Sequence, residues 1–291
     1  MKAPPFDYHR PASLRDALLL LKQPDARILA GGQSLVPMLN FRLLAPQHLV
    51  DLSQIDELRT CVITSDKIRI GAMKSQRELE NSAELARVAP IFPEAIRQIG
   101  HRQTRNRGTI GGSLCHLDPS AELPTLALLH DAIFEIVSTE GVRHASAQDF
   151  ILGAMNPALE EGEILTHVEM PVWRPGHGFA FLEHARRAGD FALASAGILV
   201  AVDSDGRIAR LAICIGGLGD RPMRLAAAES ELIGAMPGKD MFDRAAAHIA
   251  ALPAEGSIHA SAAYKRRIAE TLLKRALETA CARAAHMVSV A

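Results

Sequence analysis

The sequence lacks the markers of several protein classes. It contains no run of about 18 or more apolar residues, which a membrane-spanning helix would need. Its first residues, Met1 to Phe6, lack the apolar core of a signal peptide. The net charge of −1 provides no overall attraction to nucleic acid or to an anionic membrane. These absences favour a cytoplasmic protein that binds neither membrane nor nucleic acid.

Closely spaced metal-binding residues are also missing. The four cysteines form no C-x-x-C pair, and the 12 histidines form no H-E-x-x-H pattern. Iron–sulfur and zinc sites usually show such spacing. We therefore expect no metal ligands in this chain and four reduced, mostly buried thiols: Cys61, Cys115, Cys214 and Cys281.

The length of the chain indicates more than one domain. With 291 residues, of which 48% are hydrophobic, it exceeds the size at which a single core usually stops growing. Proline and glycine interrupt the pattern between Val172 and Gly178, which predicts a boundary there. We expect one domain over 1–175, with parts at about 1–56 and 57–175, and a second over 176–291.

Two glycine pairs stand out, in Ala30-Gly31-Gly32-Gln33-Ser34 and in Thr109-Ile110-Gly111-Gly112-Ser113. Glycine has no Cβ, so its backbone N–H groups can approach an anion closely, and each segment ends in a hydroxyl. The first pair lies between a predicted strand at 25–30 and a predicted helix at 35–44, where a helix N-terminus would favour an anion. We expect two loops that close on one diphosphate, although each pair alone is more often a tight turn.

Other motifs are incomplete. Gly216-Gly217-Leu218-Gly219 does not complete G-x-G-x-x-G, because Pro222 occupies the last position. The segment from Gly32 fails the nucleophile-elbow pattern at Val36. Neither a dinucleotide fingerprint nor a serine hydrolase is indicated.

Hydrophobic periodicity and turn signals predict an α+β chain. Helices are expected at 13–22, 78–88, 93–99, 125–129, 226–233, 241–251 and 261–285. Strands are expected at 48–52, 61–63, 67–70, 133–137, 142–145, 179–183, 194–202 and 208–215.

Four segments, at 29–37, 105–113, 118–124 and 185–193, resemble in order and spacing the FAD-binding medium subunit of molybdenum hydroxylases, the xanthine dehydrogenase and carbon monoxide dehydrogenase family. The resemblance covers nearly the whole chain. It implies a two-subdomain FAD-binding fold of the vanillyl-alcohol-oxidase (PCMH) type, followed by a C-terminal α+β lobe with an antiparallel sheet.

The resemblance also implies a set of cofactor-binding residues and no acid–base catalytic residue. Residues expected along the diphosphate and ribityl are Ile28, Leu29, Ala30, Gly31, Gly32, Gln33, Ser34, Leu35, Thr109, Ile110, Gly111, Gly112 and Ser113. Those expected along the ribityl and adenosine are His116, Asp118 and Glu122, with Leu165 against the cofactor and Phe191 near the isoalloxazine. Relatives often have asparagine at Ser113, and either side chain can hydrogen-bond a phosphate or ribityl oxygen. Some relatives have a lysine at the position of Leu182, and without it the sequence does not identify the groups that tune the flavin.

As a function, the resemblance implies electron transfer within a complex. A large subunit with a molybdenum cofactor oxidises the substrate, a small subunit carries two iron–sulfur clusters, and FAD in this chain passes the electrons to an external acceptor. The expected assembly is a dimer of heterotrimers. Two alternatives stay open: a free-standing FAD-dependent oxidoreductase of the same fold, and an interaction subunit that binds no flavin.

Overall fold

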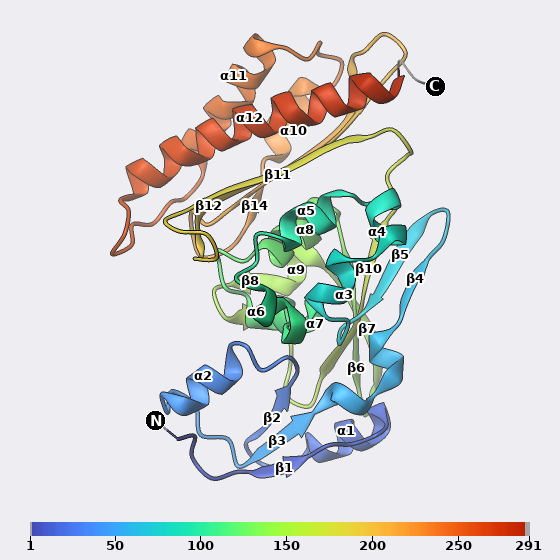
Figure 1. Ribbon diagram of the computed structural model, residues 1–291, viewed down its shortest axis with the longest axis vertical. Coiled ribbons are helices and arrows are strands. Elements are labelled where there is room, and N and C mark those ends of the chain that lie inside the picture. The colour runs from blue at the N-terminus through green and yellow to red at the C-terminus, as the bar shows by residue number, and fades with distance from the viewer. Residues whose placement is uncertain (1, 289–291) are drawn as a thin grey trace.

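The computed structural model describes residues 2–288, which form three tiers along the long axis (Figure 1). The lowest tier is a parallel sheet in the order β1-β3-β2, joined by two short helices. Its elements are β1 (Asp7–His9), α1 (Leu14–Leu20), β2 (Ala26–Leu29), α2 (Leu35–Asn40) and β3 (His48–Asp51). Ser13 caps α1 by accepting a hydrogen bond from the Asp16 N–H.

The middle tier pairs a five-stranded sheet, in the order β4-β5-β10-β6-β7, with a layer of short helices. The strands are β4 (Cys61–Ile63), β5 (Lys67–Gly71), β6 (Ile133–Ser138), β7 (Gly141–Ser146) and β10 (Ile164–Pro171). The helices are α3 (Gln76–Glu80), α4 (Ala83–Val88), α5 (Ile91–Ile96), α6 (Arg102–Arg107), α7 (Ile110–His116), α8 (Glu122–Leu129) and α9 (Ala147–Phe150). A small ribbon, β8 (Ile151–Gly153) with β9 (Asn156–Pro157), completes the tier.

Several boundaries differ from the prediction for local reasons. The helix expected at 78–88 is two helices, because the Ser82 hydroxyl accepts from the Leu85 N–H and starts α4 anew. Helix α2 ends at Asn40 rather than near 44, since Arg42 adopts a left-handed φ of 58°. Helix α8 begins at Glu122, three residues earlier than expected.

The upper tier is an antiparallel sheet in the order β11-β12-β13-β14, covered by helices. Its elements are β11 (Gly178–Ala185), β12 (Ala192–Val202), β13 (Ile208–Gly216), β14 (Met223–Arg224), α10 (Ala226–Leu232), α11 (Lys239–Ala247) and α12 (Ala262–Val288). Short 3₁₀ helices lie at Leu52–Gln54, Asp56–Arg59 and His248–Ala251. Within 2–288, no helix is long and apolar enough to cross a membrane.

The upper sheet is buried on both faces, and every residue of β12 is buried. Ile198 and Val200 pack with α12, whereas Leu199 and Ala201 face the core of the middle tier. Alternate residues of a strand point to opposite faces, so β12 contributes to two cores at once. The upper tier therefore extends the core of the middle tier, and the lowest tier has a smaller core of its own.

Candidate functional site

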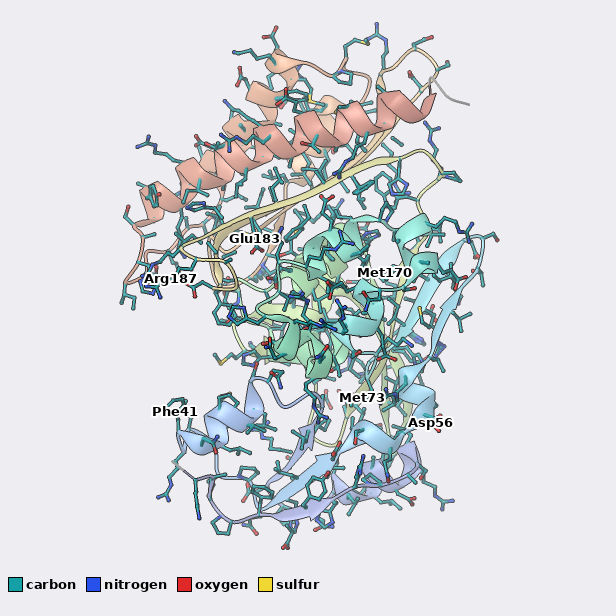
Figure 2. The ribbon with its side chains drawn as sticks, in the orientation of Figure 1. Phe41, Asp56, Met73, Met170, Glu183 and Arg187 are labelled. Atoms are coloured by element: carbon teal, nitrogen blue, oxygen red, sulfur yellow. The ribbon has the colours of Figure 1, made fainter. Side chains whose placement is uncertain are left out.

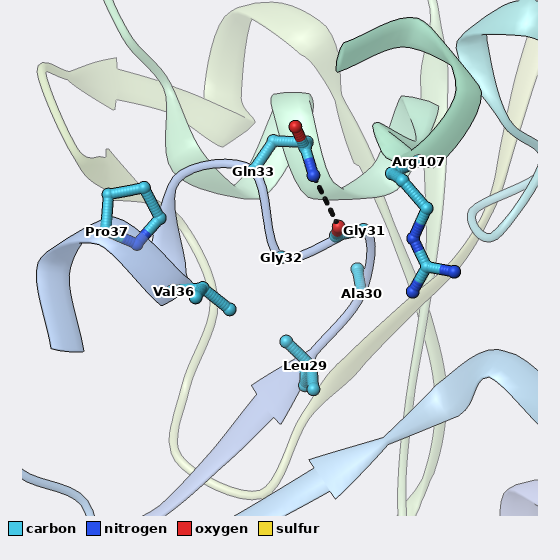
Figure 3. A pocket seen from close by; sticks show the side chains of 8 residues that line it. All are labelled: Leu29, Ala30, Gly31, Gly32, Gln33, Val36, Pro37 and Arg107. Atoms are coloured by element: carbon cyan, nitrogen blue, oxygen red, sulfur yellow. Dashed lines mark hydrogen bonds between the residues drawn. The ribbon is translucent and has the colours of Figure 1, made fainter. Parts of the chain in front are cut away.

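The first glycine pair forms an open turn between β2 and α2. Gly32 has a left-handed φ of +73°, which glycine adopts without strain. The side-chain amide of Gln33 donates to the Gly31 carbonyl at 3.2 Å (Figure 3). No acceptor among the described residues takes the backbone N–H of Gly32, Gln33 or Ser34. Because unpaired N–H groups need water or a ligand, this turn can bind an anion.

The second glycine pair is not a loop. It lies in the first turn of α7, and Thr109 caps that helix by accepting from the Gly112 N–H at 3.0 Å. The Ile110 N–H donates to the Lys74 carbonyl, and the Gly111 N–H donates to the Ala72 carbonyl at 2.8 Å. These N–H groups are therefore already used, which corrects the expectation of a second backbone cradle.

Close packing explains glycine at position 111. A Cβ there would lie 2.5 Å from the Ala72 Cβ and 2.8 Å from the Ala72 carbonyl oxygen. The side chain of Ile110 is buried as well. From this segment, the side chain of the half-buried Ser113 remains available to a ligand, whereas Ile110 and Gly111 serve the core.

The two motifs nevertheless meet directly. A Cβ on Gly31 would lie 2.1 Å from the carbonyl oxygen of Arg107, and a Cβ on Gly112 would lie 3.4 Å from the Ala30 Cβ. The turn is thus held against the segment that precedes α7. Only glycine at position 31 permits this contact.

A pocket of about 380 Å³ opens beside the first turn (Figure 3). Its lining includes Leu29, Ala30, Gly31, Gly32 and Gln33, all expected from the sequence, together with Val36, Pro37 and Arg107.

Arg107 supplies the cationic wall of this pocket. Arg105 pairs with Glu80 at 2.9 Å, but Arg107 is exposed and forms no salt bridge with any described residue. Its side chain extends beside Ala30 (Figure 3). Arg107 is not among the cofactor-binding residues expected from the sequence, although its place two residues before Thr109 is a usable signal.

The remaining expected residues lie away from this pocket. His116 ends α7, and the Asp118 carboxylate accepts from the Ser120 N–H at 2.8 Å, which shapes the turn into α8. The buried Glu122 begins α8. Because α7 has seven residues and a helix rises 1.5 Å per residue, His116 lies about 9 Å along the helix axis from Ile110. We call the turn at 30–34, α7 and the segment up to Glu122 the strip.

Leu165 and Phe191 occupy contrasting environments. Leu165 lies in β10 with its side chain 3% exposed and belongs to the core of the middle tier. Phe191 is 70% exposed at the β11–β12 turn. Ile28 packs in the core of the lowest tier, and Leu35 is the first residue of α2. The pocket does not bring Leu165, Phe191, Ile28 or Leu35 together.

The cysteines fit the expectation of ordinary thiols. All four are free, and burial raises the pKa of the Cys115 thiol to about 12. Among residues 2–288, no cluster of three or more His, Cys, Asp or Glu side chains could hold a metal ion.

The donors around the pocket fit a phosphate-bearing cofactor. Among the residues that the structure describes, the N–H groups of Gly32, Gln33 and Ser34 have no acceptor, and the Arg107 guanidinium beside them has no carboxylate partner. Charge-assisted hydrogen bonds to phosphate oxygens would satisfy both. A flavin dinucleotide carries such a diphosphate.

Comparison with known proteins gives matches over nearly the entire chain. Residues 4–173 match the model of the FAD binding domain in molybdopterin dehydrogenase, and residues 179–280 match the CO dehydrogenase flavoprotein C-terminal domain. The chain is 37% identical over 287 residues to the 6-hydroxypseudooxynicotine dehydrogenase complex subunit alpha of Paenarthrobacter nicotinovorans, covering 98% of this chain and 97% of that protein.

Two further proteins extend the comparison. The carbon monoxide dehydrogenase medium chain of Afipia carboxidovorans is 38% identical, with 96% of this chain and 98% of that protein covered. The crystal structure of quinoline 2-oxidoreductase from Pseudomonas putida 86 superposes with a TM-score of 0.93 at 36% identity, covering 98% of this chain and 99% of that one.

Proposed function

This chain belongs to the family of FAD-binding medium subunits of molybdenum hydroxylases, and we propose that it accepts electrons from iron–sulfur clusters of a small partner subunit and passes them to an external acceptor. Bound FAD would supply the redox chemistry. The residues of this chain would hold and orient that cofactor and control access to it. The activity is therefore that of an oxidoreductase subunit.

The observation that carries the proposal is the turn at 30–34 with its unpaired N–H groups beside Arg107. In this proposal, Gly32, Gln33 and Ser34 donate backbone hydrogen bonds to the diphosphate. Arg107 balances part of its charge. Ser113 lies on the α7 side of the same strip and offers a hydroxyl.

The rest of the strip would receive the other parts of the cofactor. His116, Asp118 and Glu122 follow α7 and would lie along the ribityl and adenosine. Leu165 and Phe191 would lie at the flavin, with Leu165 acting through the packing beneath it because its side chain is buried. No residue of this chain is assigned acid–base catalysis.

The names of the relatives support a multi-subunit setting, since they include a complex subunit alpha and medium chains of carbon monoxide dehydrogenase. We propose two partners, a small iron–sulfur subunit and a large subunit with the molybdenum cofactor, in a dimer of heterotrimers in the cytoplasm. For the domains we propose 1–175 and 176–291; the two family models, which meet between 173 and 179, support this division.

Purification of the untagged protein from its natural host tests the proposal. Flavin absorbance, iron, molybdenum and two copurifying chains are the expected result. A yellow protein that purifies alone and oxidises a substrate would favour a free-standing flavoenzyme instead. A chain that neither carries flavin nor takes up added FAD would contradict both.

A further inference from the structure

A row of polar residues crosses the C-terminal sheet on the face toward α8. Glu183, Ser195 and Gly216 lie opposite one another in β11, β12 and β13, so they share one face. A Cβ on Gly216 would lie 2.5 Å from the Ser195 Oγ and 2.7 Å from the Thr125 Oγ1. The missing side chain of Gly216 therefore lets this row meet Thr125 of α8.

Helix α8 brings a second carboxyl group to the same place. Glu122 lies three residues before Thr125, and residues at this spacing share a helix face. Glu122 is 9% exposed and Thr125 is fully buried. Figure 2 shows Glu183 near the hairpin end of β11, on the side toward the helices of the middle tier. Glu122 and Glu183 thus come from the two sides of the contact between α8 and the sheet.

Two polar atoms of the cluster formed by Glu122, Thr125, Glu183 and Ser195 lack hydrogen-bond partners among the described residues. Within 2–288, neither Glu183 Oε2 nor Ser195 Oγ has a hydrogen-bond partner, and both atoms are buried. The Lys265 amine donates to the Gly217 carbonyl at 3.0 Å, and neither Glu122 nor Glu183 forms a salt bridge with any described residue. Buried carboxylates without cations are costly, and such a group usually keeps its proton instead.

The surroundings of both carboxyl groups favour the protonated form, mainly because both groups are buried. Burial raises the pKa of Glu122, and the negative charges of Glu183 and Asp118 raise it further. A hydrogen bond from its own backbone N–H opposes this rise. Burial also raises the pKa of Glu183.

We propose that Glu122 and Glu183 form a proton-binding site, which keeps at least one of the two carboxyl groups protonated and so keeps α8 docked on the C-terminal sheet. Loss of that proton to solvent leaves two carboxylates in a largely buried interface, where like charges repel. The site uses only residues of this chain and goes beyond the proposed electron transfer. Because Glu122 is also proposed to lie along the cofactor, the test compares samples with the same FAD content.

The sign of the pH effect follows from linkage. The folded-state pKa values lie above the unfolded ones, so the native state binds more protons than the unfolded state over the interval between them. The stabilisation is fully present below the unfolded pKa of about 4.5 and is lost as pH rises through the folded values. Opening here means local unfolding that separates α8 from the sheet, and the opening constant is the equilibrium constant of that step. If opening releases one proton, the opening constant rises about tenfold per pH unit.

Amide hydrogen exchange on the full-length chain tests this, with FAD content matched between samples. The samples are wild type, Glu183→Gln, the double variant Glu122→Gln/Glu183→Gln, and Glu161→Gln as an exposed control. After correction for intrinsic exchange, we expect the opening constant of α8 and β11–β13 in wild type to rise by up to about tenfold per pH unit from pH 5 to 8. In Glu183→Gln, the opening constant should rise less steeply with pH than in wild type, and in the double variant it should not change with pH. A wild-type slope in the double variant would overturn the proposal.

Carbon-13 NMR of glutamate carboxyl groups gives a second measurement that needs no variant to fold. We expect at least one glutamate carboxyl group in wild type to titrate well above the others. If all glutamate carboxyl groups titrate together near their ordinary pKa, no proton is held at this site and the proposal is wrong.

Discussion

The backbone of Arg107 lies directly against Gly31, so that a Cβ on Gly31 would be 2.1 Å from the Arg107 carbonyl oxygen. This contact joins the β2–α2 turn to the segment that starts α7. It places the unpaired N–H groups of the turn and the Arg107 guanidinium on one pocket. FAD retention should therefore depend on this contact more than on either glycine motif alone.

Gly31→Ala should release FAD. The added methyl group meets backbone atoms of Arg107 and Gly108, which cannot rotate away, so the turn must shift. We expect flavin per chain to fall at least tenfold while the far-UV circular dichroism stays that of the wild type. Gly238→Ala is the matched control, because nothing lies within 4 Å of its added Cβ. Full flavin content in folded Gly31→Ala would argue against the site.

Arg107→Gln should weaken FAD binding without unfolding the chain. A hydrogen bond to a charged group contributes about 1.5 to 3 kcal/mol, so the dissociation constant should rise roughly ten- to hundredfold. Fluorescence titration of the flavin-free chain measures it. Arg102→Gln, on the same exposed helix α6, should bind FAD like wild type. Equal affinities for both variants would remove Arg107 from the site.

Gly111→Val should act differently from Gly32→Val. At Gly111, the new side chain meets Ala72, so we expect a loss of thermal stability of several degrees or failure to fold. Gly32 has a left-handed φ, and its Cβ would meet the Val36 side chain at 3.1 Å, so the turn itself should be disturbed and flavin lost. Differential scanning calorimetry combined with flavin analysis separates the two outcomes. A fully stable Gly111→Val would show that α7 can move off Ala72.

His130 should make the fold sensitive to acid. It is 1% exposed, neither ring nitrogen has a partner among the described residues, and burial lowers its pKa to about 3, with His177, Arg210 and Arg224 adding repulsion. The native state binds fewer protons, so stability is lost as pH falls from about 6.5 toward 3, by up to about 1.4 kcal/mol per pH unit.

Urea unfolding at several pH values measures this effect. His130→Phe, which keeps a ring beside Phe92, should flatten the slope between pH 6.5 and 4.5. The exposed His144→Gln should keep it. An unchanged slope in His130→Phe would mean that other groups cause the acid sensitivity.

Glu94 and Arg283 should couple the middle and upper tiers. The Glu94 carboxylate accepts from Arg283 at 2.9 Å and from the Phe181 N–H at 2.8 Å. The Arg283 guanidinium also lies 4.3 Å from the centre of the Phe179 ring. A double-mutant cycle with Glu94→Gln and Arg283→Gln should give a coupling of about 1 kcal/mol, since both side chains are partly exposed. Additive effects would show no coupling.

Local signals sufficed for much of this fold. The cap at Ser13, the strand before the first glycine pair, and the hairpins of β4–β5 and β12–β13 were predictable because turn chemistry and alternation are local. The resemblance carried the family assignment, which the comparisons confirm.

Non-local pairing explains what was missed. Strand β10 contains polar residues at Thr166 and His167, yet it is the central strand of its sheet, paired with β5 and β6 from distant parts of the chain. Likewise, the glycines of α7 read as a loop until the position of Ala72 is known, because only the packing partner distinguishes a tight helix contact from a phosphate loop. The role of Arg107 likewise depends on a tertiary contact, the one between its backbone carbonyl and Gly31.

A crystal structure of the chain with FAD bound tests the central claim most directly. The account predicts diphosphate oxygens within about 3.2 Å of the backbone N–H groups of Gly32, Gln33 and Ser34, with the Arg107 guanidinium alongside. A diphosphate bound elsewhere, with those N–H groups still facing solvent, would contradict it.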